Sequence, residues 1–402
     1  MGKTTSKPKL SSRAAGMPAS PIRRLIPYAL EAKKRGIEVY HLNIGQPDIP
    51  TPESFFDALR NFPGKTVGYQ LSQGNPDYIK ALSEYYRRCG YDVSEEDVLV
   101  TTGGSEAIIF AMQAVASQDE EIIVFEPFYT NYAGYAVMSG VKLVPVTTSV
   151  ETGYHLPPRE EIESKITPKT RAILICTPNN PTGTVLTREE VQTIADIAAG
   201  HNLFIISDEV YREFVFEGRH TGVFDIAGIS ERAIVMDSIS KRYSVCGARI
   251  GCLVCKNRDV ISAFLKFGQA RLSSPSVEQF AAAALTRLGE DYFEGVRREY
   301  RIRRDVVIDA LNRVDGVVCH RPHGAFYVMA RLPVDSAEDF AKFMLNDFSV
   351  DGHTTMVAPG DGFYATRGVG GDEIRIACVL RETDLKKAMD VLIKGLRQYR
   401  KI

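Results

Sequence analysis

The sequence has no tryptophan, only seven cysteines in 402 residues, and no apolar run long enough to cross a membrane. A spanning helix needs about 18 or more apolar residues in succession, whereas runs such as 172–176 and 203–206 have the length of buried strands. The cysteines are odd in number and scattered, which favours reduced thiols over a disulfide framework. We therefore expect a protein without a membrane span, located in the cytoplasm.

The sequence also has no excess of one charge sign, because its 49 Lys and Arg residues are balanced by 50 Asp and Glu residues. Proteins that bind nucleic acids or membrane surfaces usually carry a basic face or tail, so neither partner is expected. The Cys252–Cys255 pair lies in an apolar segment without a second pair or a histidine at zinc spacing. No metal site is expected.

The chain length allows two or three domains, or one large body with a smaller cap. Residues 1–20 are basic and rich in serine, and no apolar signal segment follows them, so we expect a flexible tail. We expect a large domain at 53–299. A small domain is expected to combine 21–52 with 300–402.

Short β-branched runs alternate with amphipathic stretches through most of the chain, which indicates an α/β fold with a mostly parallel sheet between helices. Beyond a long charged helix at 292–314 the pattern changes to an α+β cap, with strands at 324–330 and 373–378 and a closing helix at 383–400. The other expected strands are 98–101, 122–125, 142–146, 172–176, 203–207, 233–237 and 249–254, and the other expected helices are 22–35, 105–117, 129–139, 188–200, 259–269 and 276–288.

Polar side chains follow several strands at the point where each strand ends. Ligands of open parallel sheets bind beyond these carboxyl ends. The segment 103–106 follows one strand and opens a helix, where free N–H groups suit a phosphate. No P-loop and no G-x-G-x-x-G turn is present, which argues against a P-loop NTPase and a usual dinucleotide fold. The side chains expected at the rim are Asn180, Asp208, Tyr211, Lys241 and Arg249.

Each of these residues also has an ordinary interpretation. Lys241 could be a solvated loop residue, Asp208 could cap a helix, and the turn at Asn180 could be only a turn. Their order and spacing together match one known chemistry.

Five motifs together resemble the class I/II aminotransferases, which are pyridoxal-phosphate (PLP) enzymes of fold type I. The bacterial aspartate aminotransferase group is the most similar. The resemblance extends from Pro21 to nearly the end of the chain, and it implies a mostly parallel sheet with a smaller α+β domain. The motifs are Asn43-Ile-Gly-Gln-Pro-Asp48, Asn180-Pro-Thr-Gly183, Ser207-Asp-Glu-Val-Tyr211, Ser238-Ile-Ser-Lys241 with Gly247-Ala-Arg249-Ile-Gly251, and Glu373-Ile-Arg375-Ile.

The resemblance implies a role for each residue around the cofactor ring. Lys241 resembles the lysine that holds PLP as a Schiff base and moves the proton at the substrate Cα. Asp208 resembles the acid that pairs with the pyridine nitrogen. Asn180 and Tyr211 resemble the pair that binds the ring 3′-oxygen, and Tyr129 resembles the aromatic residue that stacks on the ring.

The resemblance also implies a phosphate cup and a grip on the substrate. The phosphate cup is the set of groups that binds the cofactor phosphate. It consists of backbone N–H groups, a hydroxyl, an arginine fork and a tyrosine from the neighbouring subunit of a homodimer. Arg375 resembles the arginine that binds the α-carboxylate beside Gly45 and Asn180, although it could instead pair with Asp372 or Glu373. The residues at the cup positions are Gly104, Ser105, Glu106, Ser238, Arg249 and Tyr69.

The implied reaction moves an amino group between an L-amino acid, first aspartate or glutamate, and a 2-oxo acid such as 2-oxoglutarate. An aromatic or alanine aminotransferase, a C–S lyase or a cyclopropane-forming synthase on the same fold stays open. A non-catalytic PLP-binding regulator is not expected, because roughly twenty residues before the first helix are too few for a DNA-binding module. The residue that binds a side-chain carboxylate is not matched, and the candidates are Arg23, Arg24, Lys65 and Arg271.

Overall fold

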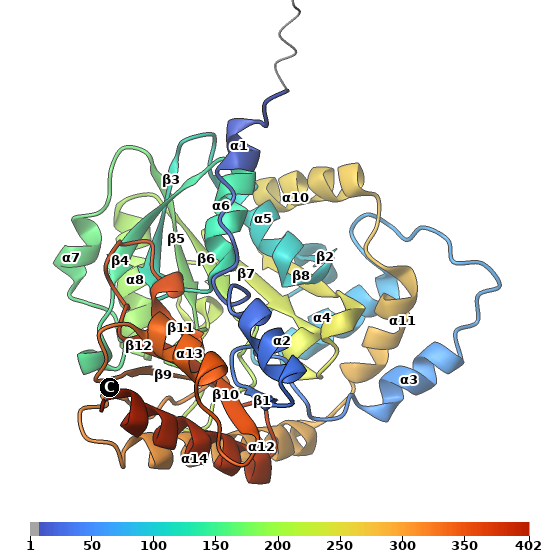
Figure 1. Cartoon of the computed structure of the whole chain (residues 1–402). Helices are drawn as coiled ribbons and strands as arrows, with labels where there is room; N and C mark the ends of the chain where they lie inside the picture. The colour runs from blue at the N-terminus through green and yellow to red at the C-terminus, as the bar shows by residue number, and fades with distance from the viewer. Residues whose placement is uncertain (1–7, 402) are drawn as a thin grey trace, which may run out of the picture.

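The computed structural model describes residues 8–401. Its main sheet has seven strands in the order β2-β8-β7-β6-β5-β3-β4 (Figure 1). All neighbouring pairs are parallel except those that involve β8, which runs antiparallel to both β2 and β7. The expected mostly parallel sheet is thus confirmed. The strands are β2 (Val98–Thr101), β3 (Glu121–Glu126), β4 (Lys142–Thr147), β5 (Thr170–Cys176), β6 (Phe204–Asp208), β7 (Ala233–Ser238) and β8 (Gly251–Cys255).

Helices cover both faces of this sheet. Alternate side chains of one strand point to opposite faces, so Ile123 packs in one core cluster while Ile122 and Val124 pack in the other. The first cluster includes side chains of α4, α8 and α11, and the second includes those of α5, α6 and α10. These helices are α4 (Pro76–Arg88), α5 (Gly103–Val115), α6 (Asn131–Ser139), α8 (Arg188–Gly200), α10 (Arg258–Arg271) and α11 (Ser276–Leu285).

A third core cluster joins the two ends of the chain. Strand β1 (Glu38–His41) pairs in parallel with β10 (His353–Met356), and β12 (Glu373–Ala377) lies between β11 (Ala358–Pro359) and β9 (Tyr327–Arg331) in an antiparallel sheet. The other helices are α1 (Ser12–Ala15), α2 (Ile26–Lys34), α3 (Glu53–Arg60), α7 (Arg159–Glu163), α9 (Ile239–Arg242), α12 (Glu290–Leu311), α13 (Ala337–Asn346) and α14 (Glu382–Tyr399).

The expected elements are present with shifted bounds: α11 ends at Leu285 and α12 at Leu311, each three residues earlier than expected, and three other elements start later than expected. Helix α2 begins at Ile26 rather than residue 22, because residues 21–25 form turns and Pro27 favours the first helical turn. Strand β8 begins at Gly251, since Arg249 before it has a left-handed φ of 56°. Strand β9 begins at Tyr327, after Ala325 with a φ of 51°.

Candidate active site

A cavity of about 440 Å³ lies at the carboxyl ends of the central parallel strands. Asp208, the last residue of β6, and Lys241, which follows β7, both line it. Asn180 and Arg375 line it as well. The strand ends thus gather the residues that the sequence placed at one rim.

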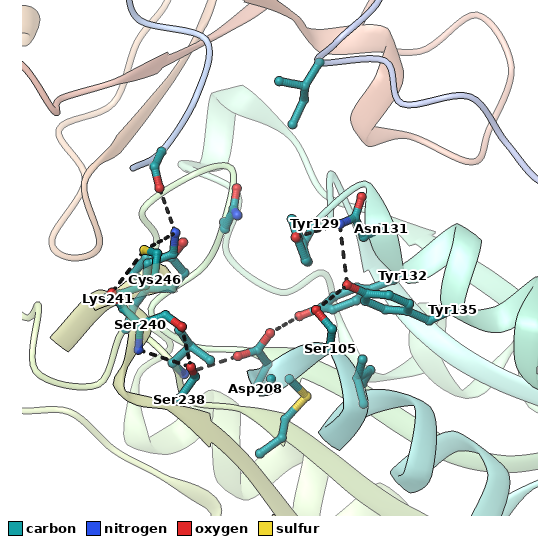
Figure 2. Close-up of a pocket in the computed structure, with 18 of the residues that line it drawn as sticks. Ser105, Tyr129, Asn131, Tyr132, Tyr135, Asp208, Ser238, Ser240, Lys241 and Cys246 are labelled. Carbon is teal, nitrogen blue, oxygen red and sulfur yellow. Dashed lines mark hydrogen bonds between the residues drawn. The ribbon is translucent and has the colours of Figure 1, made fainter. Parts of the chain in front are cut away.

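The position of Lys241 is set by the short helix α9. Ser238 caps this helix by accepting a bond from Ser240 N at 3.1 Å, while its own hydroxyl donates to Ile250 O at 2.9 Å. Lys241 Nζ donates to the carbonyl oxygen of Gly45 at 2.7 Å and lies 3.8 Å from Cys246 Sγ (Figure 2). The amine therefore points into the cavity toward the loop after β1.

Asp208 is buried at the floor of the cavity. The Tyr132 hydroxyl donates a short hydrogen bond to Asp208 Oδ2, and Val210 N donates to Oδ1 at 3.2 Å (Figure 2). Burial raises the pKa of Asp208 to about 6, although these two hydrogen bonds act in the opposite direction. The carboxylate is thus held in one orientation with little solvent around it.

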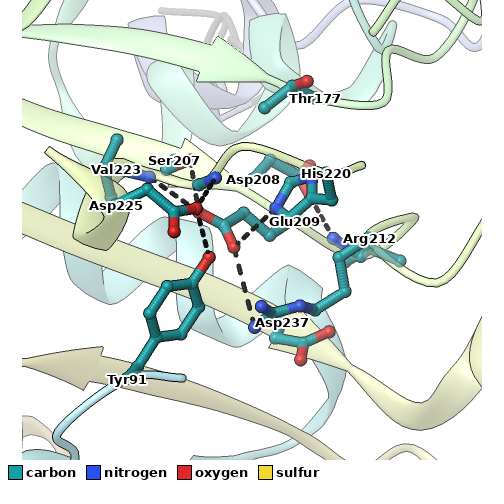
Figure 3. A network of polar contacts seen from close by, with 12 residues as sticks. Tyr91, Thr177, Ser207, Asp208, Glu209, Arg212, His220, Val223, Asp225 and Asp237 are labelled. Atoms are coloured by element: carbon teal, nitrogen blue, oxygen red, sulfur yellow. Dashed lines mark hydrogen bonds and ion pairs between the residues drawn. The ribbon is translucent and has the colours of Figure 1, made fainter. Parts of the chain in front are cut away.

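Glu209 anchors the turn after Asp208 on the far side of the strand. It accepts bonds from Ser207 Oγ at 3.0 Å and Val223 N at 3.3 Å, and His220 Nε2 lies 3.1 Å from it (Figure 3). Burial alone raises the pKa of Glu209, but His220 and the nearby Arg212 outweigh it and hold that pKa at about 2. The buried Glu209 carboxylate therefore holds the turn that carries Asp208 in place.

Arg375 is 2% exposed and faces the cavity from β12. Its Nη1 donates to Asn180 Oδ1 at 3.0 Å and its Nη2 to Asn43 O at 2.6 Å, while its guanidinium lies 4.6 Å from the Tyr327 ring centre. Burial lowers the pKa of Arg375. A buried guanidinium without a carboxylate favours an anionic ligand.

The alternative pairing of Arg375 is wrong. No ion pair joins it to Asp372 or Glu373 within residues 8–401. Glu373 instead accepts a bond from the Tyr364 hydroxyl at 2.6 Å. Burial is also the main cause that raises the pKa of Glu373.

A second group of cavity residues surrounds the first turn of α5. Gly103 has a φ of 72°, and a Cβ on it would lie 2.5 Å from an Arg249 Nη atom, so only glycine fits this close approach. The Tyr135 hydroxyl donates to Ser105 Oγ at 2.9 Å (Figure 2). The cavity residues of this group are Gly104, Ser105, Ser238 and Arg249.

The residues that the resemblance places around the cofactor ring line the walls of the cavity. The hydroxyls of Tyr211 and Tyr327 lie 2.8 Å apart, and burial raises the pKa of Tyr211. Tyr129 faces the cavity and accepts a bond from Asn131 Nδ2 at 2.7 Å. Gly45 lies against Tyr327, since a Cβ on Gly45 would be 2.5 Å from Tyr327 Cζ.

Two residues assigned to the phosphate cup do not line this cavity. The Glu106 side chain accepts from Thr102 N at 2.8 Å and from Arg271 at 2.9 Å. Tyr69 is 82% exposed, in the long loop between α3 and α4 that extends from the body in Figure 1. Neither side chain approaches the cavity of its own chain.

Several side chains around the cavity were not expected from the sequence, among them Tyr132, Cys246 and Tyr327. Tyr132 could have been found, because the helix expected at 129–139 places it three residues after Tyr129 and hence on the same side of that helix. Cys246 and Tyr327 carried no signal, since each lies in a segment without a periodic polar pattern. All three line the cavity.

The sequence model described as aminotransferase class I and II matches residues 37–392. The chain belongs to this family. It is 32% identical to aromatic-amino-acid aminotransferase 2 of Thermococcus litoralis, over 97% of this chain and 98% of the relative. It is also 32% identical to the aspartate/prephenate aminotransferase of Thermus thermophilus, over 95% and 97% of the two chains.

A solved structure agrees with this assignment. A double mutant of the Thermus thermophilus aspartate aminotransferase superposes with a TM-score of 0.89 at 29% identity, covering 97% of this chain and 100% of that one. Class I/II aminotransferases use PLP and act on amino and oxo acids. The chain is thus an aminotransferase of PLP fold type I, as the motifs implied.

Residues 8–401 include no helix with both the length and the apolar character that a membrane crossing requires. Within the same residues, no cluster of three or more His, Cys, Asp or Glu side chains is arranged to hold a metal ion. Cys252 and Cys255 are both buried in β8 as free thiols.

Proposed function

We propose that this aminotransferase transfers the amino group of L-aspartate or L-glutamate to a 2-oxo acid such as 2-oxoglutarate. The observation that carries the proposal is one cavity that holds a lysine amine, a buried carboxylate and a buried guanidinium without a carboxylate partner. These groups suit, in that order, an aldehyde, a ring nitrogen and a substrate carboxylate. The residues present therefore fit PLP together with an amino acid.

Bound PLP supplies an electron-accepting ring that makes the Cα proton of an amino acid removable. Asp208 holds the proton of the ring nitrogen, and Tyr132 and Val210 N keep its carboxylate directed at the cavity. Asn180 and Tyr211 would bind the 3′-oxygen, and Tyr129 would pack against the ring. The backbone N–H groups of Gly104 and Ser105, the Ser238 hydroxyl and the Arg249 guanidinium would bind the phosphate.

Lys241 is the residue that would hold the cofactor aldehyde and would carry the Cα proton. Its amine has to be neutral to act as a nucleophile or base. Among the described residues, the amine bonds only to the Gly45 carbonyl and the Cys246 thiol, and no carboxylate is bonded to it. The amine is therefore available to a substrate bound in the cavity.

Arg375 places the substrate. A guanidinium fork binds both oxygens of a carboxylate, which fixes the direction of the Cα bonds. Arg375 binds Asn43 O, and Lys241 binds Gly45 O two residues further along the same loop. An α-carboxylate on Arg375 thus brings Cα next to the Lys241 amine.

The active assembly is a homodimer with shared sites. Tyr69, Val67 and Leu71 are all strongly exposed on the loop between α3 and α4, and exposed apolar patches of this kind mark protein interfaces. In the dimer, Tyr69 binds the phosphate held by the neighbouring subunit. The seven free cysteines support a place in the reducing cytoplasm.

Aromatic amino acids are the second candidate substrates. The cavity is lined by the rings of Tyr129, Tyr135 and Tyr327, which suit an aromatic side chain. A relative from Thermococcus litoralis also bears the name of an aromatic-amino-acid aminotransferase.

The test is a panel of amino donors with 2-oxoglutarate as acceptor, measured as new amino and oxo acids. The proposal predicts the highest kcat/KM for aspartate, with glutamate as the donor in the reverse direction. A maximum for phenylalanine or tyrosine selects the second candidate. Pyruvate released from cysteine derivatives without any oxo acid would identify a C–S lyase and contradict both.

A further inference from the structure

The short helix α9 carries a buried ion pair that the proposed function does not use. Arg242, the last residue of α9, donates a short hydrogen bond from Nη2 to Asp237 Oδ2. The two side chains are 2% and 1% exposed. Asp237 lies in β7 directly before Ser238, and Arg242 directly follows Lys241. In the sequence, the pair therefore encloses the two residues assigned to the phosphate and the aldehyde of PLP.

Strand and helix geometry separates this pair from the cavity. Side chains alternate along β7, so Met236 and Ser238 line the cavity while Asp237 points to the opposite face of the sheet. Successive residues of a helix differ in direction by about 100°, so Lys241 faces the cavity while Arg242 faces the core. The pair therefore acts on a ligand only through its neighbours in the chain.

Asp237 joins α9 to two other elements. Its Oδ1 accepts from Ser238 N at 2.6 Å, and its Oδ2 accepts from the Tyr86 hydroxyl of α4 at 3.0 Å as well as from Arg242. The Arg242 guanidinium also lies 4.2 Å from the ring centre of Tyr85, which belongs to α4 too. One carboxylate thus connects the end of β7, α4 and α9 in a single arrangement.

Stability alone is a weak reason for such a pair. Two charges that lose their hydration in the interior seldom stabilise a fold more than apolar side chains of similar size do. A carboxylate that accepts from three donors does, however, fix one geometry. This geometry sets the position of α9 relative to the end of β7, and hence of Lys241 relative to Ser238, both of which face the cavity (Figure 2).

We propose that the Asp237–Arg242 ion pair keeps the Lys241 amine and the Ser238 hydroxyl at the separation that one PLP molecule requires. The inference rests on the proposed function and deepens it, because it names residues that position the site without contacting a ligand. PLP carries its aldehyde and its phosphate on neighbouring atoms of a rigid ring. Both groups are therefore held at once only when α9 has one position.

The test removes both charges together, because a single substitution would leave a buried charge without a partner. In Asp237→Asn–Arg242→Met, the Asn side chain still offers an oxygen to Ser238 N, so this variant is expected to unfold in urea close to the wild-type midpoint. It is expected to bind PLP about 10-fold or more weakly, the size of one hydrogen bond to a charged group. The cofactor-free protein is titrated with PLP and followed by absorbance.

Pyridoxal, which has the aldehyde but no phosphate, separates positioning from general damage. It engages Lys241 without the phosphate cup, so its affinity is expected to change less than about 3-fold in the double variant. Ser238→Ala adds a second readout. It is expected to weaken PLP binding clearly in the wild-type background and much less in the double variant, because the hydroxyl there no longer lies at the phosphate.

Arg304→Met is the matched control. Arg304 is also 2% exposed, and it forms ion pairs with Glu217 at 3.1 Å and Asp305 at 2.8 Å. It lies in α12 and does not line the cavity, and both of its carboxylate partners are partly exposed. The affinities for PLP and for pyridoxal are therefore expected to stay within about 2-fold of wild type.

The outcomes are distinct. If the double variant folds and binds PLP as tightly as wild type, the inference is overturned. Equal weakening of PLP and pyridoxal overturns it as well, because the pair then supports the fold and not the spacing of the two groups. If the double variant does not fold, the same ratio is measured for Arg242→Lys, which keeps the charge without the planar fork. An unchanged ratio in that variant overturns the inference.

The proposed function fails in a different way. If wild type transfers no amino group from any donor, the proposed function is wrong. The ratio of PLP to pyridoxal affinity does not depend on the donor, so it still decides the role of the ion pair.

Discussion

Asp208 combines burial with a fixed orientation, and both follow from its place at the end of β6. Tyr132 and Val210 N hold its two oxygens, and burial raises its pKa to about 6. An oriented carboxylate in a dry site interacts more strongly with a protonated ring nitrogen than a solvated one does. We propose that this interaction keeps the ring of PLP an effective electron acceptor.

Asp208→Asn is expected to fold and bind PLP but to lose several orders of magnitude in kcat, because an amide cannot stabilise the ring-nitrogen proton. Asp208→Glu is expected to retain more activity. The measurement is the rate of a single half-reaction followed by the change in cofactor absorbance. Turnover of Asp208→Asn close to wild type would remove Asp208 from this role.

The raised pKa of Asp208 also predicts how the stability of the cofactor-free protein depends on pH. The folded carboxyl binds its proton more tightly than the unfolded chain does, so raising the pH from about 4 to about 7 costs stability. The shift to about 6 corresponds to about 3 kcal/mol over the full titration, and about 2 kcal/mol of this loss falls between these two pH values, which Asp208→Asn lacks. Urea unfolding of both proteins at the two pH values gives this difference, and equal pH dependence would contradict the assignment.

Strand and helix ends place the functional side chains, and the sequence indicates most of them. Apolar β-branched runs bounded by polar residues predict the strands of the main sheet, so the rim residues Asn180, Asp208 and Lys241 follow from the order of elements. Strands β1 and β10 could not be predicted, since each has four residues and their pairing joins segments more than 300 residues apart in sequence.

The turn from β2 into α5 is a second feature at the scale of elements. Gly103→Ala combines a left-handed φ of 72° with a Cβ only 2.5 Å from Arg249. The backbone conformation alone costs about 1–2 kcal/mol, and moving Arg249 disturbs the proposed phosphate cup. We expect a PLP dissociation constant raised by about 10-fold or more.

Gly200→Ala is the control for this substitution, because nothing lies within 4 Å of the position that a Cβ would occupy there and its φ is not positive. It is expected to leave PLP affinity unchanged. Equal affinity of Gly103→Ala and wild type would show that Arg249 does not hold the phosphate.

At the scale of the whole molecule, we propose two domains, 53–299 and the combination of 21–52 with 300–402. Lys241 and Asp208 belong to the first and Arg375 to the second, so a substrate that contacts both favours the closed arrangement. The proposed role of Tyr69 needs a second chain, because its side chain does not reach the cavity of its own chain.

Shared sites predict complementation between inactive subunits. A hybrid of Tyr69→Ala with Lys241→Ala has one site with both substitutions and one site with neither. If Tyr69 serves the neighbouring subunit, mixing and subunit exchange are expected to restore activity above the sum of the separate variants, and Tyr69→Ala alone is expected to bind PLP more weakly. A fully active monomer in sedimentation experiments would contradict this.

The most direct test of the whole account is the identity of the residue that carries the cofactor. The PLP-loaded enzyme is reduced with borohydride and digested, and the peptide that retains the cofactor is sequenced by mass spectrometry. We predict that one peptide carries it, with the modification on Lys241, and that Lys241→Ala gives no labelled peptide and no transamination. Labelling of a different lysine, or full activity of Lys241→Ala, would contradict the account.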